Sequence, residues 1–384
     1  MLRYLTAGES HGRCLVAVIE GLPAGLKLDA STIDADLARR QSGYGRGGRM
    51  AIERDRVEFL SGVRGGETLG SPLAMLIPNR DWPNWERVMS PSALQGAVPL
   101  TCPRPGHADL PGVLKYGRSD IRDILERASA RETAARMAVG SVAKVLLSCF
   151  GTEVLGHVLA IGPVRARPAN PGLAALRKAS ESSPVRCADR AASKRMVAVI
   201  RAAVRNRDTI GGVVEVRAEG LPVGLGSHVH WDRRLDGRIA GAVVSIQAFK
   251  GVEIGDAFAV AASPGSRAHD EIFRARSGGY TRRTNRAGGL EGGITNGMPL
   301  VVRAAVKPVS TIGRPLSTVD IRTGRAARAI KERSDVCMVP AAAVVAEAVV
   351  AVELARAFQE KFGGDSVDEM KRNWRSWAGA LARR

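Results

Sequence analysis

Apolar residues recur along this chain with two spacings, one typical of strands and one typical of helices. Blocks in which apolar side chains alternate with others, or in which β-branched residues cluster, predict strands. These blocks span residues 15–23, 56–63, 151–164, 211–226 and 299–310. Apolar residues three and four positions apart predict helices over residues 32–41, 119–149, 191–205, 235–249 and 339–361. Strands and helices therefore alternate, which indicates an α/β or α+β fold.

The segment 104–136 places a histidine in front of the longest helical pattern. Prolines and glycines recur over residues 103–112, so we expect a loop there that carries His107. Arg127 and Arg131 lie four residues apart in the predicted helix and should share one of its faces. Loops held by rigid elements often carry reactive side chains, but a single histidine in such a loop is more often solvated or structural. Position alone therefore assigns His107 no role.

The composition is that of a globular protein in water, with 45% hydrophobic and 25% charged residues over 384 positions. No apolar run approaches the roughly 20 residues that cross a bilayer, and the first residues do not read as a signal peptide. The five cysteines are scattered and include no CxxC pair, so we expect neither a disulfide framework nor a zinc cluster. The length leaves the number of domains open. A reducing cytoplasm fits this cysteine usage best, and we expect no membrane partner.

The formal net charge of +19 has two explanations. A basic surface can bind nucleic acid, and basic pockets can bind small polyanions. Aromatic residues make up only 4% of the chain and do not interleave with the basic runs, whereas single-strand binders stack bases on such rings. The sequence also lacks a helix-turn-helix, zinc-finger or RNA-recognition signature. The charge therefore favours pockets for anionic small molecules over a nucleic-acid partner.

A glycine-rich stretch at residues 39–50 contains the spacing GxGxxG. In a dinucleotide-binding fold this spacing follows a strand and opens a helix, but here a helical pattern precedes it and a strand pattern follows it. We therefore reject a Rossmann interpretation. The stretch also carries Arg40, Arg46 and Arg49, whose guanidinium groups could bind phosphate or carboxylate. A solvated basic loop explains this segment about equally well.

A second histidine, His11, follows Ser10 in a glycine-flanked turn near the N-terminus. Adjacent side chains rarely form a catalytic pair, and the chain has no GxSxG nucleophile elbow, so serine hydrolysis is not expected. His11 and His107 are thus two histidines in separate glycine loops, which suggests a pair of proton donors. His228 and His230 form an HxH pair without a third ligand at metal spacing, so we expect no metal site.

Two segments in the last third of the chain could also contact a ligand. Residues 284–311 combine glycines, whose backbone amides can approach a ligand closely, with a strand that ends in Lys307 and neighbouring hydroxyl groups. A phosphate or a ring with carbonyl edges could bind there, although the segment has no P-loop signature. Arg333 and Asp335 precede an Ala/Val-rich helix, where an aspartate often serves only as a cap.

Together these segments resemble the chorismate synthase family, and the likeness covers nearly the whole chain. The matching blocks are GESHG (8–12), RRQSGYGRGGRM (39–50), RPGHAD (104–109), KYGRSDIRDILERASARETAARMAVG (115–140), DTIGGVVEV (208–216), SIQAFKGVEIGDAF (245–258), GGLEGGITNG (288–297), VKPVSTI (306–312) and RSDVC (333–337). The resemblance implies an α+β fold, a β-α-β sandwich with helices packed between two antiparallel sheets. It also implies a single domain over 1–384, with a variable surface segment at about 165–195 and a C-terminal tail from about 362. The family is usually homotetrameric.

The resemblance implies a lyase for the last common step of the shikimate pathway, which leads to the aromatic amino acids. In that step 5-enolpyruvylshikimate 3-phosphate loses phosphate and a C6 proton in a 1,4-elimination that gives chorismate. Reduced FMN is required although the reaction has no net redox change. The C6 hydrogen is only weakly acidic, so an electron-rich flavin can assist where a base alone is poorly matched. Two alternatives stay open: a flavin reductase or oxidoreductase, because some family members reduce FMN with NADPH, and a nucleic-acid-binding protein, because of the charge.

The family's functional residues fall on matching positions of this chain. His11 resembles the histidine that protonates the departing phosphate, and His107 resembles the one that lies beside the reduced flavin and balances its anionic ring. Asp335 resembles the carboxylate near flavin N5 that helps remove the C6 hydrogen, and it keeps its place in RSDVC where many family members read RHDPC. The expected substrate contacts are Ser10, Arg40, Arg46, Arg131 and Arg333, of which Arg40 and Arg46 would contact NADP if it binds. The expected flavin contacts are Arg127, Ala128, Ser129, Gln247, Ala248, Gly292, Lys307, Pro308, Val309, Ser310, Thr311 and Arg333.

Overall fold

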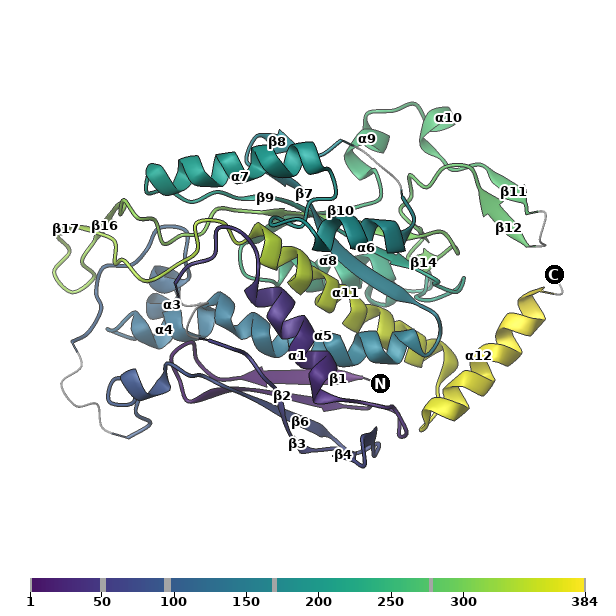
Figure 1. Cartoon of the computed structure of the whole chain (residues 1–384), viewed down its shortest axis with the longest axis horizontal. Helices are drawn as coiled ribbons and strands as arrows, with labels where there is room; N and C mark the ends of the chain where they lie inside the picture. The colour runs from purple at the N-terminus through teal and green to yellow at the C-terminus, as the bar shows by residue number, and fades with distance from the viewer. Residues whose placement is uncertain (1, 49–52, 93–97, 168–170, 276–278, 383–384) are drawn as a thin grey trace.

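Two antiparallel sheets enclose a layer of helices in the computed structural model, which describes residues 2–48, 53–92, 98–167, 171–275 and 279–382 (Figure 1). The first sheet has the strand order β1-β2-β6-β3. Its strands are β1 (Arg3–Ala7), β2 (Cys14–Glu20), β6 (Leu73–Pro78) and β3 (Glu58–Ser61). The second sheet has the order β10-β15-β9-β7-β8. Its strands are β10 (Phe249–Ile254), β15 (Leu300–Val306), β9 (Gly212–Glu219), β7 (Glu153–Ile161) and β8 (Val164–Arg165).

The burial of each strand follows from its sequence pattern. In β2, Leu15, Ala17 and Ile19 are buried while the residues between them are partly exposed, as expected for a strand with one face on the core. β7 is instead buried on both faces, because α11 (Val339–Phe362) covers its inner face and α6 (Leu173–Glu181) its outer face. The apolar residues of β2 therefore face the helices, whereas both faces of β7 lie inside the protein.

Helices fill the layer between the sheets. These helices are α1 (Ala30–Gln41), α5 (Thr133–Ser148), α8 (Leu235–Val244) and α11 (Val339–Phe362). α5 packs on the first sheet, α11 packs on β7 and β9 of the second sheet, and the two helices pack on each other. α1 and α8 flank this pair. The arrangement confirms the predicted α+β class and the β-α-β sandwich (Figure 1).

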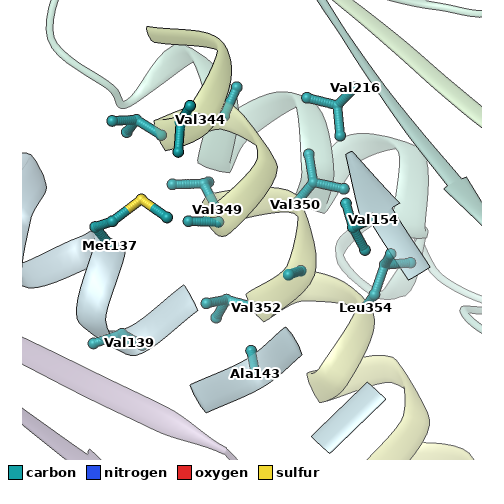
Figure 2. Packing of buried hydrophobic residues seen from close by; sticks show 14 of the residues in the cluster. Met137, Val139, Ala143, Val154, Val216, Val344, Val349, Val350, Val352 and Leu354 are labelled. Atoms are coloured by element: carbon teal, nitrogen blue, oxygen red, sulfur yellow. The ribbon is translucent and has the colours of Figure 1, made fainter. Parts of the chain in front are cut away.

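Small residues let α11 lie this close to its neighbours. A methyl group added to Gly140 of α5 would come within 2.3 Å of Ala348 Cβ, and one added to Gly156 of β7 would come within 2.0 Å of the Ala343 carbonyl oxygen. Figure 2 shows valines of α11 between Met137 of α5 on one side and Val154 of β7 on the other. A larger side chain at either glycine would push α11 away from both layers.

Shorter elements surround this sandwich. The remaining helices and helical turns are η1 (Trp82–Asn84), α3 (Asp109–Tyr116), α4 (Arg122–Ala128), η2 (Ala130–Glu132), α7 (Arg190–Arg205), η3 (Trp231–Arg233), α9 (Ala257–Ala261), α10 (Gly265–Ala268) and α12 (Val367–Ala382). The remaining strands are β4 (Val63–Arg64), β5 (Glu67–Thr68), β11 (Ile272–Arg274), β12 (Tyr280–Arg282), β13 (Leu290–Glu291), β14 (Ile294–Thr295), β16 (Ser317–Val319) and β17 (Ala326–Arg328). Within the described ranges no helix is both long and apolar enough to cross a membrane.

The predicted helix over 119–149 is wrong in one respect, because it is broken at Ser129. This residue has extended backbone angles (φ −64°, ψ 145°), and its hydroxyl accepts a hydrogen bond from Arg131 N at 3.3 Å. The chain therefore ends α4, makes the single turn η2 and restarts as α5. As a result Arg127 and Arg131 do not share a face. Asp109–Tyr116 is also helical where a loop was predicted, although His107 lies in a loop just before it, as expected.

The C-terminal tail from about 362 consists mainly of α12. Its first turns reach the main core through the buried side chains of Val367 and Met370, and Trp374 and Trp377 pack on that core from outside. Figure 1 shows the rest of α12 pointing away from the sandwich. The tail is therefore anchored at one end.

A buried carboxylate fixes α11 against three other elements. Glu347 is fully buried, and its oxygens accept hydrogen bonds from Arg39 of α1, Lys144 of α5 and the backbone N–H of Gly156 in β7, at 2.5–2.9 Å. Burial alone would raise the pKa of Glu347, but Lys144 and Arg39 hold that pKa well below its usual range. Asp36 completes the network by pairing with both cations. The carboxylate is therefore ionised and tied to three sides of the helical layer.

We predict that Glu347→Gln lowers the free energy of unfolding by about 1–3 kcal/mol, because it removes a fully buried charge from two partly buried cations that then keep only their other carboxylate partners, Asp36 among them. The carboxylate of Glu360 on the same helix is more exposed and pairs with Arg238, so Glu360→Gln should cost about 0.5 kcal/mol or less. Denaturant unfolding of both variants measures the difference. Since the pKa of Glu347 is depressed on folding, its contribution is present above the unfolded value of about 4.3 and is lost as the pH falls below it. Equal losses in the two variants would contradict this role.

Candidate active site

A cavity of about 320 Å³ lies where the N-terminal end of α11 meets the break between α4 and α5. Its walls come from segments far apart in the sequence. The lining residues are Ser10, His11, Arg40, Arg46, Gly47, Arg104, Gly106, His107, Ala108, Leu125, Ala128, Ser129, Ala130, Arg131, Thr133, Gln247, Ala248, Lys307, Val309, Ser310, Thr311, Glu332, Arg333, Ser334, Asp335, Met338, Ala341, Ala342 and Val345. All three predicted catalytic residues are among them.

His11 lies in the turn between β1 and β2 and is held from two directions. Its Nδ1 lies 3.0 Å from both carboxylate oxygens of Glu126, and its backbone N–H donates to Glu126 Oε2 at 2.8 Å. Its ring stacks on Trp85, with 3.9 Å between ring centroids. Burial would raise the pKa of Glu126, but the hydrogen bonds and charge of His11, together with Arg122, lower it below the ordinary value. His11 therefore meets an ionised carboxylate through Nδ1.

His107 is paired in the same way. Its Nδ1 lies 2.5 Å from Oδ1 of Asp109, a fully buried residue in the first turn of α3. Asp109 also accepts hydrogen bonds from Nε and the backbone N of Arg104, at 2.8 and 3.0 Å. Burial alone would raise the pKa of Asp109, but His107 and Arg104 hold it far below its usual range. Both histidines of the cavity thus have a buried anion behind Nδ1.

Arginines form the polar end of the cavity. Arg40, at the end of α1, and Arg131, in η2, share the buried carboxylate of Asp55, with N–O distances of 3.3 and 2.6 Å. Burial, and then the neighbouring charges of Arg131 and Arg46, lower the pKa of Arg40 to about 9 despite Asp55. Arg131 Nη2 also lies 3.8 Å from Glu53 Oε2, and Arg46 pairs with Asp335, so each of these arginines has a carboxylate partner. An anionic ligand in the cavity would add to these contacts.

The glycine loop after α1 packs on the segment that carries Asp335. Arg46 Nη1 lies 2.5 Å from Asp335 Oδ2, and Gly47 N donates to Asp335 Oδ1 at 2.7 Å. Gly47 must be glycine here, because a Cβ would lie 2.5 Å from the carbonyl oxygen of Ser334. The loop follows a helix, in agreement with the rejection of a Rossmann motif, and Arg49 lies outside the described residues.

Asp335 does not cap α11, which was the simpler interpretation of its position. The helix begins at Val339 with Met338 as its N-cap, and the Asp335 side chain instead bonds the glycine loop. Burial raises the pKa of the nearby Cys337 to about 12, so that residue is a neutral thiol and not a nucleophile at neutral pH. Asp335 therefore lines the cavity as part of the segment that leads into α11.

The opposite wall consists of Gln247, Ala248 and residues that follow β15. Lys307 Nζ donates to the carbonyl of Gly106 at 2.7 Å and to Ser310 Oγ at 2.8 Å. Burial and the nearby Lys250 lower the pKa of Lys307. Gln247 donates to Glu132 through Nε2, while its buried Oε1 has no hydrogen-bond partner among the described residues. This wall therefore offers donors and an acceptor to a flat polar ligand.

The fold does not bring every predicted contact to the cavity. Arg127 points away because of the break at Ser129, and it donates to the carbonyls of Thr6 and Gly8 in a separate groove beside β1. Gly292 lies in the exposed turn between β13 and β14, and Pro308 is absent from the cavity wall. Arg333 does reach the wall, with its guanidinium bonded to Asp81 at 2.7 Å.

Sequence reasoning missed the residues behind the histidines. Arg104 and Asp109 stand three positions before and two positions after His107, so their proximity was a usable signal. Trp85 and Glu126 carry no such signal, because only tertiary packing brings them to His11. Residues that face the cavity were therefore easier to identify from the sequence than the residues that contact the histidines from behind.

Comparison with known proteins identifies the family of this chain. The family model for chorismate synthase matches residues 2–359. A chorismate synthase of Symbiobacterium thermophilum is 61% identical over the full length of both chains, and one of Frankia casuarinae is 58% identical over 99% of each. A crystal structure of a chorismate synthase superposes with a TM-score of 0.82 at 42% identity, covering 100% of this chain and 99% of that one. The chain therefore belongs to the chorismate synthase family, the lyases of the last common step of the shikimate pathway.

Proposed function

We propose that the cavity of about 320 Å³ is where this chain eliminates phosphate from 5-enolpyruvylshikimate 3-phosphate, with reduced FMN as cofactor. The observation that carries the proposal is the convergence of two carboxylate-backed histidines with Arg40, Arg46 and Arg131 on one cavity. The substrate carries a phosphate and two carboxylates. A site that binds it therefore needs several cations together with a donor for the departing phosphate.

The arginine end is the proposed substrate side. Arg40, Arg46 and Arg131 would face the carboxylates and phosphate, with Ser10 beside them and Arg333 at the edge. In the reaction the C–O bond to phosphate breaks and its electron pair leaves with the phosphate oxygen. We assign to His11 the proton that this oxygen receives, and to Asp335 the removal of the C6 hydrogen. Nδ1 of His11 already faces Glu126, so proton transfer to a ligand falls to Nε2.

The opposite wall fits a reduced flavin, which when bound supplies electron density to the allylic system of the substrate. Lys307, Ser310 and Thr311 offer donors, and the buried Oε1 of Gln247 offers an acceptor to a ring with N–H and carbonyl edges. His107, backed by Asp109, would place an imidazole next to the anionic ring. Ala128, Ser129, Ala248 and Val309 would line its faces.

Three further features belong to the same proposal. NADPH could serve as the reductant, with Arg40 and Arg46 as its contacts. A homotetramer is supported by large apolar side chains that this single chain leaves exposed, among them Phe258, Ile272 and Tyr280. A cytoplasmic location is supported by the five cysteines, all of which are free thiols.

We predict chorismate formation in an anaerobic assay with photoreduced FMN, and a fall of about a hundredfold to ten-thousandfold in turnover for His11→Ala and for His107→Ala. Each change removes a proton-transfer group while leaving the carboxylate behind it. His230→Ala is the matched control, because His230 is exposed and pairs only locally with Asp232. Repeating the assay with oxidised FMN and NADPH tests whether the chain reduces its own flavin. Turnover within about twofold of the parent in both cavity variants would exclude the assignment.

We also expect Asp335→Asn to lower turnover by about a hundredfold or more while the melting temperature stays close to that of the parent. Asparagine keeps an oxygen for the Gly47 N–H but loses the negative charge that faces Arg46 and the ability to accept a proton. Steady-state kinetics and thermal unfolding of the same preparation separate the two effects. A variant with the parent's turnover and melting temperature would show that the carboxylate has no catalytic role.

Inorganic phosphate should stabilise the protein, because it supplies an anion to the arginine cluster. At a concentration about ten times its dissociation constant, the stabilisation should be about 1.4 kcal/mol, and it should be much smaller in Arg46→Gln. Thermal unfolding with phosphate, compared with sodium chloride at the same ionic strength, measures this effect. Equal stabilisation of parent and variant would mean that phosphate acts elsewhere.

A further inference from the structure

Glu126 is buried and makes several hydrogen bonds to the turn that carries His11. It lies on α4 with only 3% of its surface exposed, and both of its oxygens lie 3.0 Å from His11 Nδ1. Oε2 also accepts the backbone N–H of His11, and the Glu126 carbonyl accepts the backbone N–H of Ser10 at 3.0 Å. One residue of α4 thus holds both the ring and the backbone of the turn that carries His11.

Arg122 and Trp85 hold the Glu126–His11 pair in place, so the two side chains cannot shift as a unit. Arg122 donates to Glu126 Oε1 at 2.8 Å, and its guanidinium lies 4.9 Å from the centre of the Trp85 ring. Trp85 in turn stacks on His11 and donates through Nε1 to Asp81 at 3.1 Å. The plane of the imidazole is therefore set by Trp85, and its rotation within that plane is set by Glu126.

The proton balance of the reaction gives this contact a purpose. When an imidazolium gives its Nε2 proton to a phosphate oxygen, the neutral ring that remains carries its proton on Nδ1. A carboxylate at Nδ1 accepts a hydrogen bond from that tautomer and from the imidazolium before it, but not from the tautomer protonated only on Nε2. After the transfer, the unprotonated Nε2 still faces the cavity, where it can take up a proton for the next turnover.

We propose that Glu126 is a positioning residue that keeps the His11 proton on Nδ1 and presents Nε2 to the departing phosphate. The inference rests on the proposed role of His11. Glu126 itself does not line the cavity, so its effect on turnover passes through His11.

Glu126→Gln tests this role. Glutamine keeps the shape of the side chain, but one oxygen becomes an amide NH₂ that must face a donor, either the His11 N–H or Arg122. Turnover should fall about ten- to a hundredfold, as when a group that orients a reactive histidine is lost, while KM for the substrate changes little. In ¹⁵N NMR of the protein without ligands, the neutral His11 ring should change from the Nδ1-protonated form to a mixture of tautomers. Glu126→Asp, which keeps the charge, should restore part of the turnover and of the Nδ1–H signal.

Asp123→Asn is the matched control, since it makes the same chemical change one turn earlier on α4, where the carboxylate is exposed and pairs with Arg118. It should match the parent in both readouts. A parent-like tautomer and turnover in Glu126→Gln would overturn the proposal, even if His11→Ala is inactive. Turnover that falls equally in Glu126→Gln and Glu126→Asp, with the Nδ1–H signal intact in both, would also overturn it. Parent-like turnover of His11→Ala would instead reject the role of His11 itself.

Discussion

The position of α11 depends on one buried carboxylate. Glu347 is bonded at once to α1, α5 and β7, so the helix can neither slide nor rotate without leaving a charge unpaired in the core. Close contacts at Gly140 and Gly156 fix its distance from both layers. The segment 333–338 leads directly into this helix, and Asp335 therefore has a defined place against the glycine loop that follows α1. Helix α11, which packs between the two sheets, thus also fixes the position of a segment that lines the cavity.

Charge in the cavity is arranged in layers. Histidines and arginines face the ligand space, and buried carboxylates lie behind them: Glu126 behind His11, Asp109 behind His107 and Asp55 behind the arginine pair. The buried carboxylates hold the histidine and arginine side chains in fixed orientations. The sides of these groups that face the cavity can still contact an anion. Burial is the main cause of the lowered pKa of Arg40, and the charges of Arg131 and Arg46 add to it. We expect a site so arranged to favour a substrate with several negative charges, with His11 as the proposed proton donor to the departing phosphate.

Sequence patterns predicted a mixed α and β fold, and the family resemblance implied the sandwich and the candidate site residues, but neither predicted the contacts that hold those residues. Strand alternation located β2, and the apolar helical pattern located α11, because burial of one face or of all faces is visible in local sequence. The break at Ser129 was not visible, since the apolar spacing continues through residues 119–149 and the hydroxyl contact with Ser10 is tertiary. That break determines that Arg131 enters the cavity and Arg127 does not. Glu126 was missed for the same reason, because its partner is more than a hundred residues away.

Substrate and flavin should bind together in one cavity. A crystal structure of the full chain grown with oxidised FMN and 5-enolpyruvylshikimate 3-phosphate would locate both ligands. We expect density for both in the cavity, with the flavin ring against residues 307–311 and the substrate phosphate closest to His11 among the histidines. Density for either ligand in the groove between β1 and α8, with the cavity empty of it, would show that the two ligands do not share the cavity.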